Sequence, residues 1–269
     1  MSLKHFLPSF RNRYRFVIKH IEAITKENPC TKMLNLGTGE GDYDSALAKY
    51  TKELMSCDIN ATEIELARQI NKHVSNLTYE VQNALSTTYM DGQFDIIVNT
   101  EVIEHVGNPD AMLKEVSRLV RSGGCVVMTF PSRAFPFTYD PFNYIAQKLG
   151  FTPPFIRQGA YSFGHEYLID YNEFSHLAKS HAFQITTYAP LSGYLIGFLE
   201  MYWTGLFQYL TKGNRKNLSE YNDHALIIRP KTSKIPRLVF ITDFIIKIDR
   251  MFFTGMRHSV GKGLVLLKI

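Results

Sequence analysis

Three side chains that can move protons or bind a metal lie close together at Glu101, Glu104 and His105. Their spacing is i, i+3 and i+4, so a single helical turn would place all three on one face. Two carboxylates and an imidazole suit Mn²⁺, Fe²⁺ or Co²⁺ well and suit Mg²⁺ less well as a full set. His165 can supply a fourth ligand. A divalent metal held there would bind an acceptor oxygen and lower its pKa, so that the oxygen attacks as an anion.

The same side chains also have interpretations that need no metal. His105, with Glu104 beside it, can act alone as an acid–base group that deprotonates or orients an acceptor. His105 can also serve only in packing. Glu101 can contact a cofactor, and His165 can line a lid over the site. The spacing alone leaves these alternatives open.

A second pattern lies in residues 33–43, where a short apolar run ends in Gly37, Gly39 and Gly41. Helix-forming residues follow at once, so the segment is predicted to form a strand, a tight glycine turn and a helix. This unit opens many nucleotide- or cofactor-binding α/β sheets. Glycines allow positive φ and the close approach of a ligand, and the first N–H groups of the helix point at that ligand.

The glycine spacing argues against phosphate-containing ligands. Dinucleotide sites use G-x-G-x-x-G, whereas here the pattern is G-x-G-x-G and Asp42 stands at the position of the third glycine. An acidic residue there would repel a pyrophosphate, which argues against the alternative of a nicotinamide oxidoreductase. A P-loop is excluded because no Gly-Lys-Ser/Thr follows.

The apolar run, Asn35 and the G-x-G-x-G spacing resemble the first motif of the class I S-adenosylmethionine-dependent methyltransferases. S-adenosylmethionine has no phosphate, so it can lie over this turn without competing with Asp42. The resemblance covers residues 32–131. Within it, the E-x-x-E-H sequence at 101–105 resembles the ubiquinone-pathway O-methyltransferases and, more loosely, the small-RNA 2′-O-methyltransferases, and both resemblances imply a divalent metal (Mg, Mn or Fe).

The resemblance also implies a set of cofactor contacts. Asp58 lies at the end of the second predicted strand, about 20 residues after the turn, where the family places a carboxylate that binds the ribose hydroxyls. Alternatively, Asp58 is a helix N-cap or turn residue. Asn83 stands where the family commonly has an acid near the adenine amino group, and its side-chain oxygen can accept the same hydrogen bond. The complete expected set is Asn35, Gly37, Thr38, Gly39, Gly41, Asp58, Ile59, Asn83, Ala84 and Thr100.

The remaining elements must position these residues. Strands that alternate with helices predict a doubly wound, Rossmann-like, mostly parallel sheet. The resemblance implies seven strands, with the seventh antiparallel beside the sixth. The strands are predicted at 32–37, 53–58, 77–82, 94–99, 125–130, 183–189 and 263–269, and the main helices at 42–50, 60–73, 108–122 and 170–181.

Length and composition indicate a single globular domain spanning 1–269. The chain is 45% apolar and 20% charged, which is typical of a folded soluble protein. A net charge of +5 permits a basic patch but does not demand nucleic acid. The three cysteines show no zinc pattern, and basic residues interrupt any leader-like apolar run near the N-terminus. A cytoplasmic protein is therefore expected.

Three segments flank or interrupt the predicted sheet. Residues 1–30 contain an amphipathic helix. Residues 131–169 are rich in proline and aromatic residues and follow the end of a strand, so they are predicted to form a lid or substrate wall. Their alternative role is packing against the sheet edge. Residues 191–260 form a helical insertion with two apolar stretches.

The helical insertion has three alternative uses. Its helices can cover the sheet, form a homodimer interface, or lie on a membrane surface where a lipidic acceptor is met. Basic residues follow the first stretch and lie among the second. Glycines and Glu200 argue against a spanning helix, although the first stretch approaches the ~20 residues that a span needs.

Taken together, these residues predict methylation of a hydroxyl on a small-molecule or lipid-linked acceptor. The Asn/Asp-Pro-Pro-aromatic tetrad and the Pro-Cys nucleophile of base methylation are absent after the fourth predicted strand, and the Pro29-Cys30 pair precedes the first strand, so nucleic-acid bases are not the expected acceptors. The alternatives are an N- or C-methyltransferase of a small metabolite that works without a metal, and a non-catalytic cofactor-binding scaffold protein.

Overall fold

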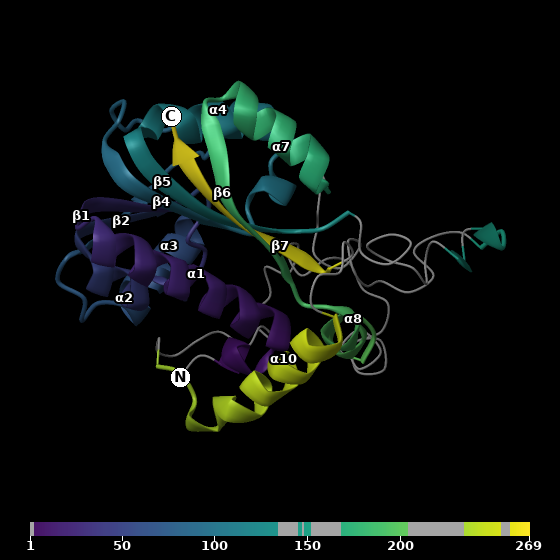
Figure 1. Ribbon diagram of the computed structural model, residues 1–269. Helices are drawn as coiled ribbons and strands as arrows, with labels where there is room; N and C mark the ends of the chain where they lie inside the picture. The colour runs from purple at the N-terminus through teal and green to yellow at the C-terminus, as the bar shows by residue number, and fades with distance from the viewer. Residues whose placement is uncertain (1–2, 134–144, 147, 152–167, 204–233, 254–258) are drawn as a thin grey trace.

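The computed structural model describes residues 3–133, 145–146, 148–151, 168–203, 234–253 and 259–269 (Figure 1). Its centre is a seven-stranded sheet with the order β3-β2-β1-β4-β5-β7-β6. The strand β7 pairs antiparallel with both β5 and β6, and the other pairs are parallel. This confirms the predicted sheet. The strands are β1 (Cys30–Leu36), β2 (Thr51–Asp58), β3 (Leu77–Val81), β4 (Phe94–Thr100), β5 (Val120–Pro131), β6 (Phe183–Leu191) and β7 (Gly261–Lys268).

Helices cover both faces of this sheet (Figure 1). One face packs against α1 and α2, and the other packs against α4 and α7. The helical elements are η1 (Leu3–Phe6), α1 (Pro8–Glu27), α2 (Asp44–Leu47), η2 (Ala48–Tyr50), α3 (Ala61–Ile70), η3 (Ile103–His105), α4 (Pro109–Leu119), α7 (Tyr171–Ser180), α8 (Tyr194–Gly197), η4 (Phe198–Trp203), η6 (Arg237–Val239) and α10 (Phe240–Phe253).

The central strands are apolar on both sides because both sides are covered. In β1, Leu34 belongs to the cluster on the α4 and α7 side, whereas its neighbour Met33 belongs to the cluster on the α1 side. In β4, Ile97 and Ile96 divide in the same way. An apolar run such as 96–98 of β4 is therefore the expected sequence of a buried parallel strand.

Three of the predicted helices begin at capping side chains. The Oδ1 atom of Asn60 accepts from the N–H of Thr62, and that of Asn108 accepts from Ala111. Asp170 caps α7 in the same way. Such caps satisfy backbone donors that the helix itself leaves unpaired. The two asparagine caps fix where the chain turns back after β2 and β4.

The boundary between α4 and β5 differs from the prediction. Residues 121–124 were expected to end the helix, but α4 stops at Leu119 and β5 already begins at Val120. The register along β4 shifts between the pairs Phe94–Val120 and Ile96–Cys125, which marks an irregularity that absorbs the extra residues.

Only part of each predicted insertion lies in the described residues. Most of the aromatic segment 131–169, predicted as a lid, lies outside the described residues. His165 also lies outside them. The described part of the insertion 191–260 contains the helices α8, η4, η6 and α10. No helix within the described ranges combines the length and apolar character needed to cross a bilayer.

Candidate cofactor and active site

The glycine turn after β1 adopts the left-handed backbone that its sequence predicts. The φ angles are 83° at Gly37, 52° at Gly39 and 77° at Gly41. The N–H groups of Gly37 and Thr38 donate to the carbonyl oxygen of Cys57 at 2.8 and 2.9 Å. The turn is thereby fastened to the end of β2, at the carboxyl edge where α/β sheets bind ligands.

The three glycines serve different purposes. A Cβ added to Gly37 would come within 2.2 Å of Cγ2 of Val102, and one added to Gly41 would lie 2.7 Å from Nδ2 of Asn71. A Cβ added to Gly39 would meet no atom within 4 Å. Gly37 and Gly41 therefore allow close internal packing, whereas Gly39 faces open space. This open position fits a cofactor that approaches the backbone of the turn.

Asp44 holds the turn together from inside the protein, a role that no sequence pattern predicted. Its buried carboxylate accepts hydrogen bonds from Asn35, Thr38, Ser56 and Tyr79 at 2.7 to 2.8 Å. Burial raises the pKa of Asp44, although these hydrogen bonds act in the opposite direction. Only the fold brings these donors from three strands together with the turn.

This network changes the interpretation of Asn35 and Thr38, which were predicted to contact the cofactor. Both are buried, and their side chains are hydrogen-bonded to each other and to Asp44. Their side chains therefore support the turn from beneath.

Asp58 lies at the end of β2, next to the open side of the turn. One carboxylate oxygen accepts from the N–H of Gly39 and the other from the N–H of Asn60, both at 2.9 Å. The helix cap is Asn60 and not Asp58. Each carboxylate oxygen can accept more than one hydrogen bond, so Asp58 keeps capacity for ribose hydroxyls. Ile59 follows with 69% of its surface exposed and offers an apolar surface beside the acid.

Three further residues of the predicted cofactor-binding set are exposed or half-buried. Asn83 is exposed after β3, and its Oδ1 atom accepts from the N–H of Leu85 at 2.9 Å. Ala84 and Thr100 are both half-buried, and Thr100 ends β4. Asn83 and Ala84 follow β3, and Thr100 is the last residue of β4. In the strand order, β3 and β4 lie on either side of β1, which the glycine turn follows.

The loop after β4 begins with a strained residue. Glu101 has a φ of 55°, which is unusual for a residue other than glycine and is often found at functional sites. Its Oε1 atom accepts from Oγ1 of Thr129 at 3.0 Å, and its Oε2 atom lies 3.2 Å from Nη1 of Arg13. Glu101 thus links this loop to β5 and to α1.

Glu104 and His105 lie next to each other in contrasting environments. Glu104 is 1% exposed, and neither of its carboxyl oxygens has a hydrogen-bond partner among the described residues. Burial and the charge of Glu101 raise the pKa of Glu104 well above its ordinary value. The side chain of His105 is 44% exposed, and its Nε2 atom lies 3.9 Å from Oε1 of Glu104. A buried carboxyl with a raised pKa beside an accessible imidazole is a typical feature of acid–base sites.

The three predicted metal ligands do not share one helical turn. The short helix η3 begins at Ile103, so Glu101 precedes it, and the Glu101 carboxylate contacts Thr129 and Arg13. Within the described part of the chain, no group of three His, Cys, Asp or Glu side chains is placed to hold a metal ion. The metal set that includes His165 stays a prediction, since that residue is outside the described ranges.

Two basic residues near the N-terminus reach the site, and sequence reasoning missed both. Lys4 lies 2.7 Å from a carboxylate oxygen of Glu40 and 2.5 Å from one of Asp42. Lys4 therefore offsets the negative charge of Asp42, which would otherwise repel a pyrophosphate. Arg13 reaches Glu101, as described above. No spacing signal ties these residues to the turn, because the contacts join α1 and η1 to elements distant in the sequence.

The comparisons with known proteins agree with this geometry. Residues 34–128 match the family described as a methyltransferase domain. Among curated relatives, the chain is 28% identical to the ubiquinone/menaquinone biosynthesis C-methyltransferase UbiE of Hydrogenovibrio crunogenus, over 51% of this chain and 58% of that protein. It is 26% identical to a sarcosine/dimethylglycine N-methyltransferase of Halorhodospira halochloris, over 76% and 78%. It is 28% identical to the ubiquinone biosynthesis O-methyltransferase of Pseudomonas aeruginosa, over 44% and 53%.

The fold is shared with solved structures at low sequence identity. A putative sarcosine dimethylglycine methyltransferase from Galdieria sulphuraria superimposes with a TM-score of 0.57 at 12% identity, covering 93% of this chain and 84% of that one. The sheet and the glycine turn define a Rossmann-like cofactor-binding protein. Over residues 34–128, the chain is similar in sequence to the S-adenosylmethionine-dependent methyltransferases. It spans between about half and four fifths of the length of these curated relatives.

Proposed function

We propose that this protein transfers the methyl group of S-adenosylmethionine to a hydroxyl oxygen of a small-molecule or lipid-linked acceptor. The observation that carries the proposal is the open face of Gly39 beside Asp58, with the Glu104–His105 pair after the neighbouring strand β4. S-adenosylmethionine, when bound, supplies an activated methyl group. The chain's own task is to align the acceptor in line with that group and to exclude water.

Each side of this site has a separate role. The backbone at Gly39 and the Asp58 carboxylate hold the amino-acid and ribose portions of the cofactor. Ile59 and Val81, which are 69% and 52% exposed, provide apolar surface for its adenine ring. Asn83 adds a polar contact there. The intact glycine turn and the retained acid favour an enzyme over a non-catalytic scaffold.

The acid–base step is assigned to His105. An oxygen acceptor must lose its proton during transfer, and His105 is the accessible member of the Glu104–His105 pair. When ionised, Glu104 would stabilise the imidazolium that forms beside it. In this arrangement Glu104 acts through His105 and is a positioning residue.

The chemical class of the acceptor needs its own test, because the relatives include C-, N- and O-methyltransferases by name. A second candidate is therefore N- or C-methylation of a small metabolite, which needs no strong base when the acceptor is already nucleophilic. The measurement that separates the two is methyl transfer from labelled S-adenosylmethionine to matched acceptors that present a phenol, an alcohol or an amine. Exclusive transfer to the amine would overturn the assignment to oxygen.

Cofactor identity has an independent test. Calorimetric titration with S-adenosylmethionine should show saturable binding, and titration with NADH should show none. Binding of NADH alone would reject the methyltransferase assignment. Binding of S-adenosylmethionine without transfer to any acceptor would instead favour a scaffold.

One set of assays tests separately whether His105 is the general base and whether a metal is required. His105→Ala should lower turnover by about 10²-fold or more if His105 is the general base. Full activity in His105→Ala would show that His105 is not the general base. Activity is also measured after chelation and metal add-back, with His165→Ala in parallel. Full activity in the presence of chelator would show that the enzyme needs no metal.

A further inference from the structure

The helix α10 exposes a large apolar surface. It packs against α1 and α8, and its buried residues are Thr242, Ile246 and Asp249. Its opposite side carries large hydrophobic side chains that face solvent: Phe240 is 62% exposed, Phe244 63%, Met251 70% and Phe252 67%, with Ile241 also exposed. In Figure 1, α10 forms the edge of the molecule farthest from α4 and α7.

These exposed side chains form one continuous strip. Phe240, Phe244 and Met251 follow one another at helical spacings of four and seven residues, and Ile241 and Phe252 lie beside them at a spacing of eleven. The apolar area of such a strip on a surface helix is larger than that of the scattered apolar residues that monomeric proteins normally expose.

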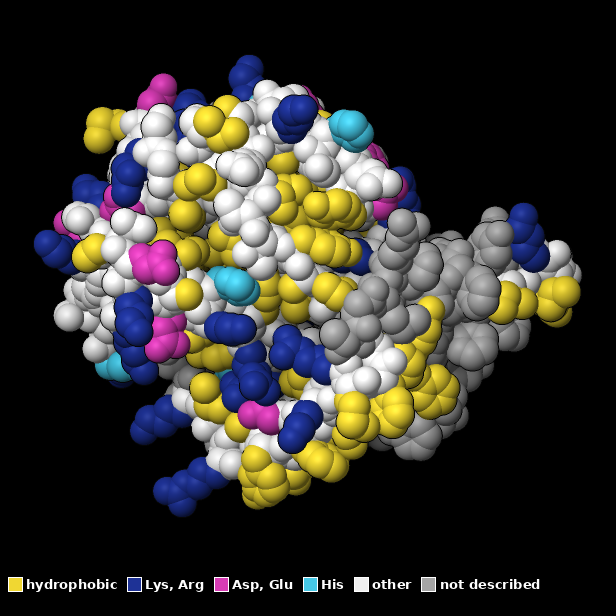
Figure 2. All heavy atoms as spheres, viewed as in Figure 1, with side chains coloured by type: hydrophobic (Ala, Val, Ile, Leu, Met, Phe, Trp, Pro, Cys, Tyr) yellow, Lys and Arg dark blue, Asp and Glu magenta, His cyan; other side chains and the backbone are white. Residues whose placement is uncertain are grey.

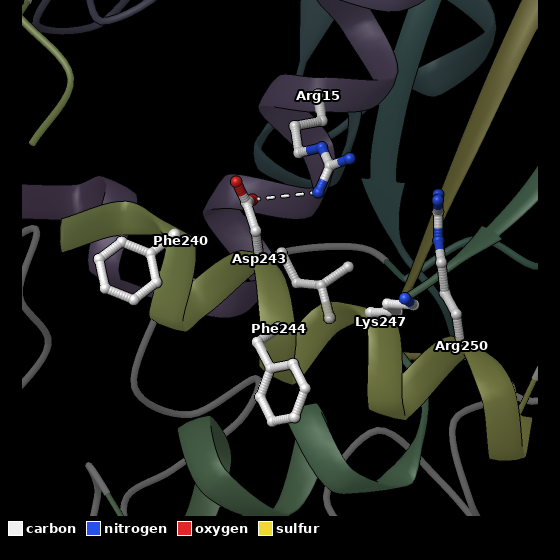
Figure 3. Close-up of a pocket in the computed structure, with 7 residues that line it drawn as sticks. Arg15, Phe240, Asp243, Phe244, Lys247 and Arg250 are labelled. Carbon is white, nitrogen blue, oxygen red and sulfur yellow. Dashed lines mark hydrogen bonds and ion pairs between the residues drawn. The ribbon is translucent and has the colours of Figure 1, made fainter. Parts of the chain in front are cut away.

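Cationic side chains border one side of this strip. A surface pocket of about 390 Å³ is lined by Arg15 of α1 and by Lys247 and Arg250 of α10, together with Phe240 and Phe244 (Figure 3). Figure 2 shows Lys and Arg side chains gathered where α1 and α10 meet, with hydrophobic side chains along the edge below them.

The acidic residues of α10 offset this positive charge only in part. The carboxylate of Asp243 is engaged on both oxygens by Arg11 and also receives a hydrogen bond from Arg15 at 3.1 Å. Asp249 is 2% exposed and accepts from the backbone N–H groups of residues 193, 195 and 196. The face presented to solvent therefore combines aromatic and aliphatic groups with a cationic border.

We propose that this α10 face binds the surface of an anionic phospholipid bilayer. Phe240, Phe244 and their apolar neighbours would enter the boundary between headgroups and acyl chains, with Lys247 and Arg250 at the level of the lipid phosphates. A helix with an apolar face beside basic residues is the arrangement that lies in a membrane interface. Positive charge favours anionic lipids over neutral ones. This inference rests on α10 and does not depend on the methyl-transfer activity.

The test is vesicle sedimentation of the full chain. Wild type should bind vesicles of phosphatidylcholine mixed with phosphatidylglycerol, bind phosphatidylcholine alone much more weakly, and lose binding as salt rises. Lys247→Glu should weaken binding to the mixed vesicles by about tenfold or more, because it reverses a charge at the surface. Phe240→Gln with Phe244→Gln should weaken binding to a similar degree.

Matched controls carry the same changes elsewhere. Lys179→Glu on α7 and Met90→Gln alter an exposed cation and an exposed apolar residue away from α10, and both variants should bind like wild type. Circular dichroism verifies that each variant is folded.

Several results would overturn the proposal. One is the absence of binding to the mixed vesicles, and another is equal binding by wild type and the α10 variants. Competition by inorganic phosphate at constant ionic strength would identify a site for a single anion and not a bilayer surface. A dimer in light scattering that is lost in the Phe240→Gln and Phe244→Gln variant would identify a second copy of the chain as the occupant.

Discussion

At the scale of single residues, two carboxylates that each accept from two backbone N–H groups serve as a test position and its control. Asp58 accepts from two backbone N–H groups beside the glycine turn, and Asp95 accepts from the N–H groups of Thr31 and Lys32 at 2.8 and 2.9 Å. Asp58→Ala should weaken S-adenosylmethionine binding by about 1–3 kcal/mol, because the ribose hydroxyls lose their acceptor. Calorimetry measures the difference. Asp95→Ala should leave cofactor affinity unchanged, and unchanged affinity in Asp58→Ala would refute the assignment.

Glu104 gives the second residue-scale prediction. Because its pKa is raised in the folded protein by burial and by the charge of Glu101, the folded state retains a proton that the unfolded chain releases near pH 4.5. Stability is therefore lost as pH rises from that value through the pKa of the folded state. Glu104→Gln cannot ionise, so its free energy of unfolding should exceed that of wild type at neutral pH, with the gap closing toward pH 4.5. Urea denaturation at several pH values is the measurement, and a gap independent of pH would contradict the raised pKa.

At the scale of elements, different glycines of the turn serve internal packing and cofactor binding. Gly39→Ala meets no neighbouring atom, so it should cost only about 1–2 kcal/mol for the left-handed backbone while strongly reducing S-adenosylmethionine affinity. Gly37→Ala meets Val102 and should destabilise the fold by more than Gly39→Ala. Adding Val102→Ala to Gly37→Ala should restore part of the stability. Thermal denaturation and calorimetry distinguish the two sites, and equal stability losses would contradict the geometry.

The Asp44 network joins β1, the turn, β2 and β3, and it belongs to the same scale. Asp44→Asn replaces an acceptor oxygen by a donor that faces other donors, so the free energy of unfolding should fall by about 1–3 kcal/mol. Ser56→Ala removes one of the four donors and should cost less. Chemical denaturation of both variants tests this order, and a neutral Asp44→Asn would show that the network is not needed for stability.

At the scale of the whole molecule, cofactor binding should stabilise the folded state. A ligand that binds only the folded chain adds about 2.7 kcal/mol when its concentration is a hundred times its dissociation constant. The melting temperature should therefore rise with S-adenosylmethionine and stay constant with NADH. Because α1 reaches the site through Arg13 and Glu101 and also packs on α10, the stabilisation should appear as one cooperative transition. A second transition that ignores the cofactor would indicate that α10 unfolds separately.

The sequence was informative wherever a structure depends on neighbouring residues. The apolar runs of β1 and β4, the helix starts near Asn60 and Asn108, and the glycine spacing of the turn are local patterns with direct physical causes, and the structure confirms them. Alternation of strands and helices then limited the fold to a doubly wound sheet. The boundary of β5 was predicted wrongly because a register shift against β4 depends on the partner strand.

The tertiary structure alone decided which polar groups meet. Asp44 is unremarkable in the sequence, yet its donors come from β1, β2, β3 and the turn. Glu104 and His105 are adjacent in the sequence, but only packing buries one and exposes the other. Likewise, the spacing of residues in α10 predicts an apolar stripe, and only the fold determines which side is covered by α1 and α8. Burial and charge pairing depend on atoms far away in the chain, and therefore no local pattern could have predicted them.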